Sequence, residues 1–74
     1  LRVMIDVNVP ANKLEQLVNL LPCMRRPTIA PLYGEDAFAI KAAVPKDQLP
    51  ILIPQIKAHG GTDIVVTAPD QLVS

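Results

Sequence analysis

Side chains that could carry out chemistry are few in this sequence and lie far apart along it. There is one histidine, His59, and one cysteine, Cys23. Acid–base or nucleophilic catalysis needs a base beside a nucleophile, with a third group that orients the base. His59 stands before two glycines at the expected end of a helix, where contact with the helix dipole is a sufficient role. We therefore predict no catalytic residue in this chain.

A single cysteine also limits the metal and redox chemistry. Cys23 cannot form a disulfide within the chain, and no second thiol is present for a two-cysteine metal site. One cysteine is compatible with a reducing cytosol. We expect a cytoplasmic domain that holds neither a metal nor a cofactor of its own.

The charges and the hydropathy argue against two further classes of partner. Seven basic and seven acidic side chains balance along the 74 residues, and the one basic cluster is Arg25 with Arg26. A protein that binds a phosphate backbone carries a concentrated positive surface instead. No apolar run approaches the length needed to cross a bilayer. The sequence thus predicts a soluble domain that binds neither nucleic acid nor a membrane.

The hydrophobic period predicts the elements that would position these side chains. Alternating apolar residues predict strands, and apolar residues three and four apart predict helices. On this basis we expect strands at 2–7, 28–32, 37–44 and 64–66, and helices with apolar stripes at 14–21 and 49–56. The turn at 33–36 is short enough for the second and third strands to form a hairpin. Pro27 and Pro31 predict that the second strand lies at a sheet edge or is irregular.

Both helices have sequence signals at their ends. The first should end at Pro22, and it should begin either with Asn12 and Glu15 as a capping box or with Asn8 ahead of Pro10.

For the second helix, Asp47 is the expected cap and Gly60–Gly61 the expected end. Pro54 falls within its apolar stripe, so this helix should be kinked there or be shorter than its pattern.

The order of elements predicts an α+β fold of the ferredoxin-like type. In this βαββαβ plan, a four-stranded antiparallel sheet carries two helices on one face. We expect one domain over residues 1–74, with an aliphatic core because the sequence has one Phe, one Tyr and no Trp. Half of the residues are apolar, so we expect other domains or subunits to cover part of the surface.

This fold hosts many functions, and the residues exclude two of them. An RNA-recognition domain needs aromatic side chains on its central strands and a basic face. A copper-carrying domain of this fold needs two thiolates close together. The sequence provides neither set, so small-molecule sensing and pure assembly remain.

Four segments resemble the C-terminal regulatory domain of the long-form ATP phosphoribosyltransferases. Residues 21–32, LPCMRRPTIAPL, resemble that family's LPG(M/L)xSPT(V/I)xPL stretch. MIDVNVP at 4–10 is similar to its first strand and turn, and AIKAAVP at 39–45 is similar to its third strand. IPQIKAHGG at 53–61 is similar to its second helix, where Pro54 also has a place. The resemblance covers essentially the whole chain in order, and PTIAPL is its most specific part.

The resemblance implies a regulatory role for this chain. The parent enzyme would join ATP and phosphoribosyl pyrophosphate in the first step of histidine biosynthesis, using Mg²⁺ and a catalytic domain that precedes this one. The domain itself would bind L-histidine for feedback inhibition and promote assembly of a homo-oligomer, a hexamer in the parent enzyme. The chain begins in a strand-like run without an initiator Met, as expected for the C-terminal part of a longer enzyme.

The resemblance also assigns residues to the L-histidine site. In the family, the polar position two before the proline after the first strand contributes to the site, as does the threonine of the Pro-Thr pair. In this sequence these are Asn8 and Thr28, with Met24 and Ala43 as walls and Asp6 as a further acceptor beside Asn8. Asn8 is neutral where an Asp can occur, which would weaken charge pairing with the ammonium group of the ligand.

Each of these residues also has a purely structural interpretation. Asp6 and Asn8 are suited to accept hydrogen bonds at a turn or helix cap, and Thr28 is a good strand residue without any ligand. Arg26 stands where the family has a small Ser, and fits a solvated or subunit-facing role together with its neighbour. Asp63 fits a turn before the last strand.

Two other functions therefore stay open. One is an oligomerisation module of the same fold without a ligand, and the other is a sensor of another small metabolite. A ligand site predicts that Asn8 and Thr28 converge on one cleft. Pure assembly predicts no shared cleft.

Overall fold

The chain folds into strands and helices in the predicted order. The computed structural model describes residues 1–21 and 26–68. Each helix follows a short 3₁₀ turn, η1 (Ala11–Lys13) or η2 (Lys46–Gln48). The strands and helices are β1 (Arg2–Pro10), α1 (Leu14–Leu20), β2 (Thr28–Pro31), β3 (Ala37–Pro45), α2 (Leu49–Ala58) and β4 (Thr62–Thr67).

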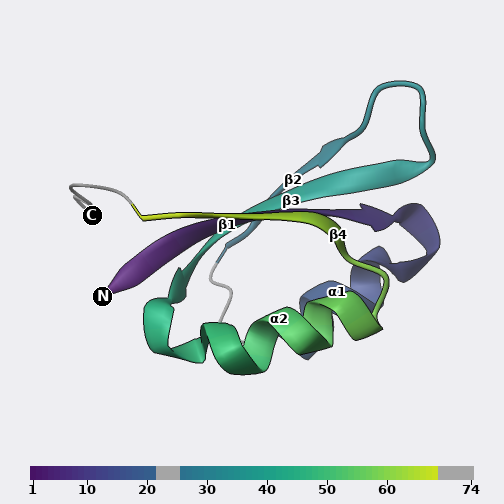
Figure 1. Ribbon diagram of the computed structural model, residues 1–74. Coiled ribbons are helices and arrows are strands. Elements are labelled where there is room, and N and C mark those ends of the chain that lie inside the picture. Colours follow the sequence, from purple (N-terminus) through teal and green to yellow (C-terminus); the bar gives the residue numbers. More distant parts are fainter. Residues whose placement is uncertain (22–25, 69–74) are drawn as a thin grey trace.

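The four strands form one antiparallel sheet in the order β2-β3-β1-β4. Both helices lie on the same face of this sheet (Figure 1). The expected ferredoxin-like fold is therefore confirmed. β2 and β3 form the predicted hairpin, and β2, which ends with Pro31, lies at an edge of the sheet, where proline is tolerated.

An aliphatic core fills the space between the sheet and the helices. Alternate residues of β1 are buried there, as the strand period predicts. The buried apolar side chains are Val3, Ile5, Val7, Val9, Leu17, Leu21, Ile40, Ala42, Val44, Leu52 and Ile56. Phe38 packs against this cluster from its rim, whereas Tyr33 is fully exposed in the β2–β3 turn. No helix within the described ranges is long and apolar enough to cross a membrane.

The predicted capping side chains are not used, which corrects the expectation for Asn12 and Asp47. Neither the 3₁₀ turns nor the helices begin with a side-chain cap hydrogen bond. Backbone carbonyls from elsewhere in the fold take this role instead. The Ala11 amide donates to the Asp36 carbonyl at 3.0 Å, and the Lys46 amide donates to the Leu1 carbonyl at 2.9 Å. The first amides of the two 3₁₀ turns are therefore satisfied by backbone carbonyls that are distant in the sequence, and not by the capping side chains that the sequence offers.

The second helix runs through its internal proline and ends as predicted at the glycine pair. α2 is ten residues long with Pro54 inside it, so the shorter helix is excluded. At its end, the Gly60 amide donates to the Lys57 carbonyl and the Gly61 amide to the Ile56 carbonyl. Gly60 has φ +88. These bonds and the left-handed glycine form a Schellman motif, which turns the chain directly into β4.

Candidate functional site

The face of the sheet that the helices leave uncovered, here called the open face, brings residues from all four strands together. The strand register and alternation define it. One row across the sheet is Thr28, Lys41, Asp6 and Val65. The neighbouring rows are Ala30, Ala39, Asn8 and Thr62 on one side and Ala43, Met4 and Thr67 on the other. The central row therefore carries the charged residues Lys41 and Asp6, and the rows beside it mix apolar residues with Asn8, Thr62 and Thr67.

The structure assigns the described candidate ligand residues to this one face. Asp6, Asn8, Thr28 and Ala43 all lie on it, whereas Met24 lies outside the described residues. Thr28 and Asn8 nevertheless sit in adjacent rows and are separated by β3, roughly 10 Å across the sheet. They share a face, but the cavity that Asn8 lines does not include Thr28.

Asp6 has a partner on the neighbouring strand. Its carboxylate Oδ1 lies 3.9 Å from the Lys41 ammonium, the residue opposite it in β3. Both side chains are well exposed, at 42% for Asp6 and 60% for Lys41. Water screens such a pair, so it stabilises the fold by less than about 1 kcal/mol. The ion pair leaves both groups accessible to a ligand on the open face.

Asn8 contributes to a polar cluster at the end of the sheet. Its Nδ2 donates a hydrogen bond to Oδ2 of Asp63 at 3.2 Å, and the Thr62 hydroxyl lies 3.5 Å from both the Asn8 carbonyl oxygen and the same Asp63 oxygen. A cavity of about 180 Å³ opens beside this cluster. It is lined by Asn8, Val9, Pro10, Leu32, Glu35, Ala37, Gly60, Thr62 and Asp63.

Asp63 is the member of this cluster that the sequence analysis missed as a site residue. It is the second residue of β4 rather than a turn residue before the strand, and its φ of +53 is left-handed. The register between β1 and β4 shifts between Asp6 and Asn8, beside this residue. A carboxylate after Gly-Gly-Thr gave only a turn signal in the sequence. The long-range contact with Asn8, 55 residues away, decides its position.

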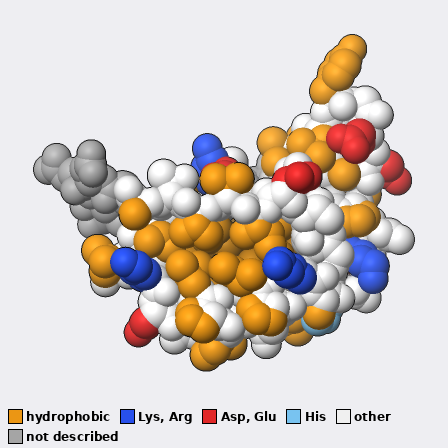
Figure 2. Space-filling model, viewed as in Figure 1, with side chains coloured by type: hydrophobic (Ala, Val, Ile, Leu, Met, Phe, Trp, Pro, Cys, Tyr) orange, Lys and Arg blue, Asp and Glu red, His pale blue; other side chains and the backbone are white. Residues whose placement is uncertain are grey.

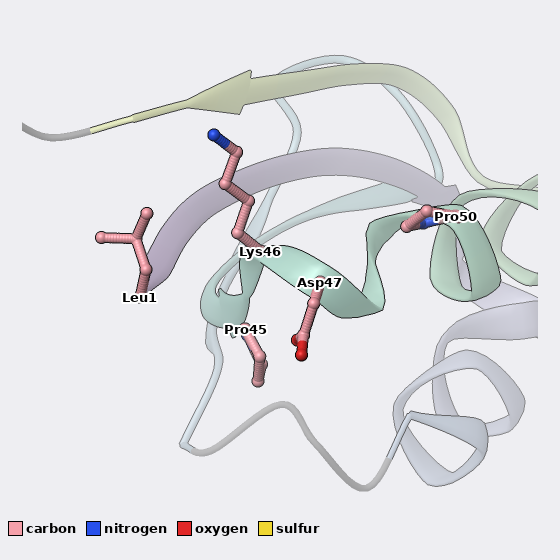
Figure 3. A pocket seen from close by; sticks show the side chains of 5 residues that line it. All are labelled: Leu1, Pro45, Lys46, Asp47 and Pro50. Carbon is pink, nitrogen blue, oxygen red and sulfur yellow. The ribbon is translucent and has the colours of Figure 1, made fainter.

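Two other cavities have lining residues that are less suited to binding one ligand. The larger, about 640 Å³, lies beside the first residue of the chain and is lined by Leu1, Pro45, Lys46, Asp47 and Pro50. In Figure 3 the charged ends of Lys46 and Asp47 point in opposite directions, so they do not meet on one ligand. The other is lined in part by His59, the residue that follows α2, and the Nδ1 of His59 lies 2.9 Å from the carbonyl oxygen of Gln55 in that helix. This agrees with the prediction of a helix-end role.

Apolar side chains are also exposed on the outer edge of the sheet. Val65 and Val66 of the edge strand β4 are 54% and 42% exposed, and Ile51 of α2 is 58% exposed. Figure 2 shows hydrophobic side chains gathered over β4 and the adjoining part of α2. An edge strand with exposed apolar residues is a surface suited to association.

Together the fold and the site define a class of protein: a ferredoxin-like domain with an open sheet face and a polar cleft at one end. Residues 1–69 match the family described as "HisG, C-terminal domain". The chain belongs to this family.

Curated relatives agree with this assignment. The chain is 41% identical over 71 residues to an ATP phosphoribosyltransferase of Pyrobaculum calidifontis, covering 96% of this chain and 25% of the relative. It is 42% identical over 73 residues to that of Pyrobaculum islandicum, covering 99% and 26%. For Desulfosudis oleivorans the identity is 41% over 61 residues, covering 82% and 21%. The chain thus spans about a quarter of the length of the relatives it matches.

Proposed function

We propose that this chain is the regulatory domain of an ATP phosphoribosyltransferase and binds L-histidine on the open face of its sheet. The relatives that carry this enzyme name are about four times as long as the aligned segment, which leaves room for a catalytic domain in the same polypeptide. That domain would join ATP to phosphoribosyl pyrophosphate and would hold the Mg²⁺. The described part of this chain has no group of three His, Cys, Asp or Glu residues suited to a metal.

One observation carries the ligand proposal. Asp6, Asn8, Thr28 and Ala43 come from three strands and face the same side of the sheet. A free amino acid presents an ammonium, a carboxylate and a side chain, so its site needs acceptors, donors and an apolar wall on one surface. Asn8 and Thr28 share the face but not the cavity that Asn8 lines, so a ligand that contacts both would extend across β3. The open face offers acceptors at Asp6 and Asn8, a hydroxyl at Thr28 and a small apolar wall at Ala43.

Feedback follows if L-histidine binds one quaternary state of the enzyme better than another. The ligand then shifts the population toward the state it prefers, by no more than its difference in affinity for the two. The exposed apolar residues of β4 and α2 favour contacts with other subunits or with the catalytic domain. These residues also support the second candidate function, a ligand-free assembly module.

A titration of the isotope-labelled chain with L-histidine tests the proposal. Saturable amide shifts on the open face, seen with L-histidine but not with D-histidine or L-leucine, are the expected result. The same titration is repeated by calorimetry on the intact enzyme, because a neighbouring subunit can complete the site. Absence of heat and of inhibition by L-histidine in the intact, oligomeric enzyme would contradict the proposal and leave the ligand-free assembly module or a sensor of another small metabolite.

A further inference from the structure

A carboxylate lies beside Asn8, the position where the predicted site has a neutral residue although an Asp can occur there. Asn8 is neutral, yet Oδ2 of Asp63 lies 3.2 Å from its Nδ2. Resting on the proposed function, we propose that Asp63 supplies the negative charge that pairs with the ammonium group of the bound amino acid. In this chain the charge beside position 8 is thus carried by Asp63 of β4 rather than by residue 8 itself.

The hydrogen bonds around Asp63 hold this charge in place while leaving acceptors available. The Asn8 amide and the Thr62 hydroxyl both lie within hydrogen-bond distance of Oδ2 of Asp63. Within the described residues, the side-chain hydrogen bonds of the Asp63 carboxylate therefore involve that one oxygen. An ionised carboxylate accepts several hydrogen bonds on its two oxygens. Oδ1 of Asp63 and the amide oxygen of Asn8 are therefore suited to an ammonium group, which donates three.

The charge of the cavity determines the kind of ligand group that it favours. Of its nine lining residues, the charged ones are Asp63 and Glu35, both negative. A hollow lined by one sign of charge concentrates ligands of the opposite sign. An organic ammonium is such a ligand group, because it carries a positive charge and can donate hydrogen bonds to the carboxylate of Asp63 and to the amide oxygen of Asn8.

The backbone conformation at position 63 limits which substitutions can test this role without disturbing the fold. With φ at +53, position 63 favours residues that tolerate the left-handed region, and Asn is the best suited of those with a side chain. Asp63→Asn therefore removes the charge while keeping the shape and the backbone. The double variant Asn8→Asp/Asp63→Asn moves the charge back to β1 across the same hydrogen bond.

The experiment measures calorimetric affinities of the intact protein that carries this chain. The ligands are L-histidine and imidazole propionic acid, which lacks only the ammonium group. We expect Asp63→Asn to weaken L-histidine binding about tenfold or more, as for loss of a charged hydrogen bond. It should leave the affinity for imidazole propionic acid unchanged, and the double variant should recover L-histidine binding. Asp36→Asn, which removes a charge from the neighbouring turn outside the cavity, should bind as the wild type does.

Each failure has a distinct meaning. If the wild type does not bind L-histidine, the proposed function is wrong and this inference with it. If the wild type binds and Asp63→Asn binds equally well with an unchanged melting temperature, Asp63 is not the ammonium partner, although the proposed function stands. An equal loss in Glu35→Gln would mean a general negative potential rather than a pairing with Asp63, and would overturn the assignment.

Discussion

The carbonyl oxygen of Ile56 accepts a 2.8 Å hydrogen bond from the Gly61 amide, and position 61 has no room for a side chain. A Cβ there would overlap Cγ2 of Ile56 and would lie 3.0 Å from Cγ2 of Val7. Ile56 and Val7 are both buried core residues. This contact therefore joins the end of α2, the start of β4 and the central strand β1, and it fixes where Thr62 and Asp63 begin.

Gly61→Ala should destabilise the fold by roughly 1–3 kcal/mol, because the added methyl group overpacks a core that cannot move apart easily. The free energy of unfolding from urea denaturation measures the loss. Gly34→Asn is the control, since Gly34 has φ +75 and nothing within 4 Å of an added Cβ. Asn tolerates that conformation, so its effect should be small. Equal stability of Gly61→Ala and the wild type would contradict the packing described above.

Leu17 should dominate the attachment of α1 to the sheet. It is the buried residue of this seven-residue helix and has 0% exposure. Leu17→Ala should cost about 2–5 kcal/mol through lost burial and a remaining cavity. Leu20→Ala, on the same helix at 38% exposure, should cost less than about 1 kcal/mol. Comparable losses for the two variants, measured by thermal and urea unfolding, would show that the helix does not pack on its Leu17 side.

Thr28→Val should lower the L-histidine affinity about threefold to tenfold without destabilising the fold. The change keeps the β-branched shape that suits a strand and removes only the hydroxyl, worth about 0.5–1.5 kcal/mol as a neutral hydrogen-bond partner. Thr67→Val is the matched control, because Thr67 faces the same side from the other edge of the sheet. Calorimetry of the intact protein gives both affinities. A normal response in Thr28→Val would remove this residue from the site.

Pro54→Ala should stabilise the domain by about 1–3 kcal/mol. Proline within a helix lacks the amide that would donate to the carbonyl four residues earlier, here Pro50. Pro50→Ala provides the comparison, since Pro50 is in the first turn, where the amide has no helical partner. Its effect should stay within about 1 kcal/mol. A loss of stability in Pro54→Ala would mean that this proline has a tertiary role that the helix geometry alone does not explain.

The strands and helices were largely predictable because their signals are local. The alternation at Val3, Ile5 and Val7 and the stripe at Leu52 and Ile56 correspond directly to buried positions. Caps were predicted less well. Asn12 and Asp47 have suitable side chains, but the first amides of the 3₁₀ turns bond to distant backbone carbonyls that no local pattern encodes.

The residues of the candidate site were also predicted only in part. The resemblance over the whole chain assigned Asn8, Thr28, Met24 and Ala43 to the site, and Asp6 was added as an acceptor beside Asn8. The sequence did not predict that Asp63 would lie beside Asn8 or that Lys41 would face Asp6. Such pairings depend on strand order and register, which the hydrophobic period leaves open.

By itself, the sequence determined the element types, the aliphatic core and the family, because periodicity, composition and motifs are properties of neighbouring residues. Only the tertiary structure decided which polar groups meet. The Gly60–Gly61 turn reverses the chain, and a register shift beside Asn8 brings Asp63 within hydrogen-bond distance of it. The Asp63 carboxylate of β4 thereby lies beside the neutral Asn8 of β1, because packing joins residues that are 55 positions apart.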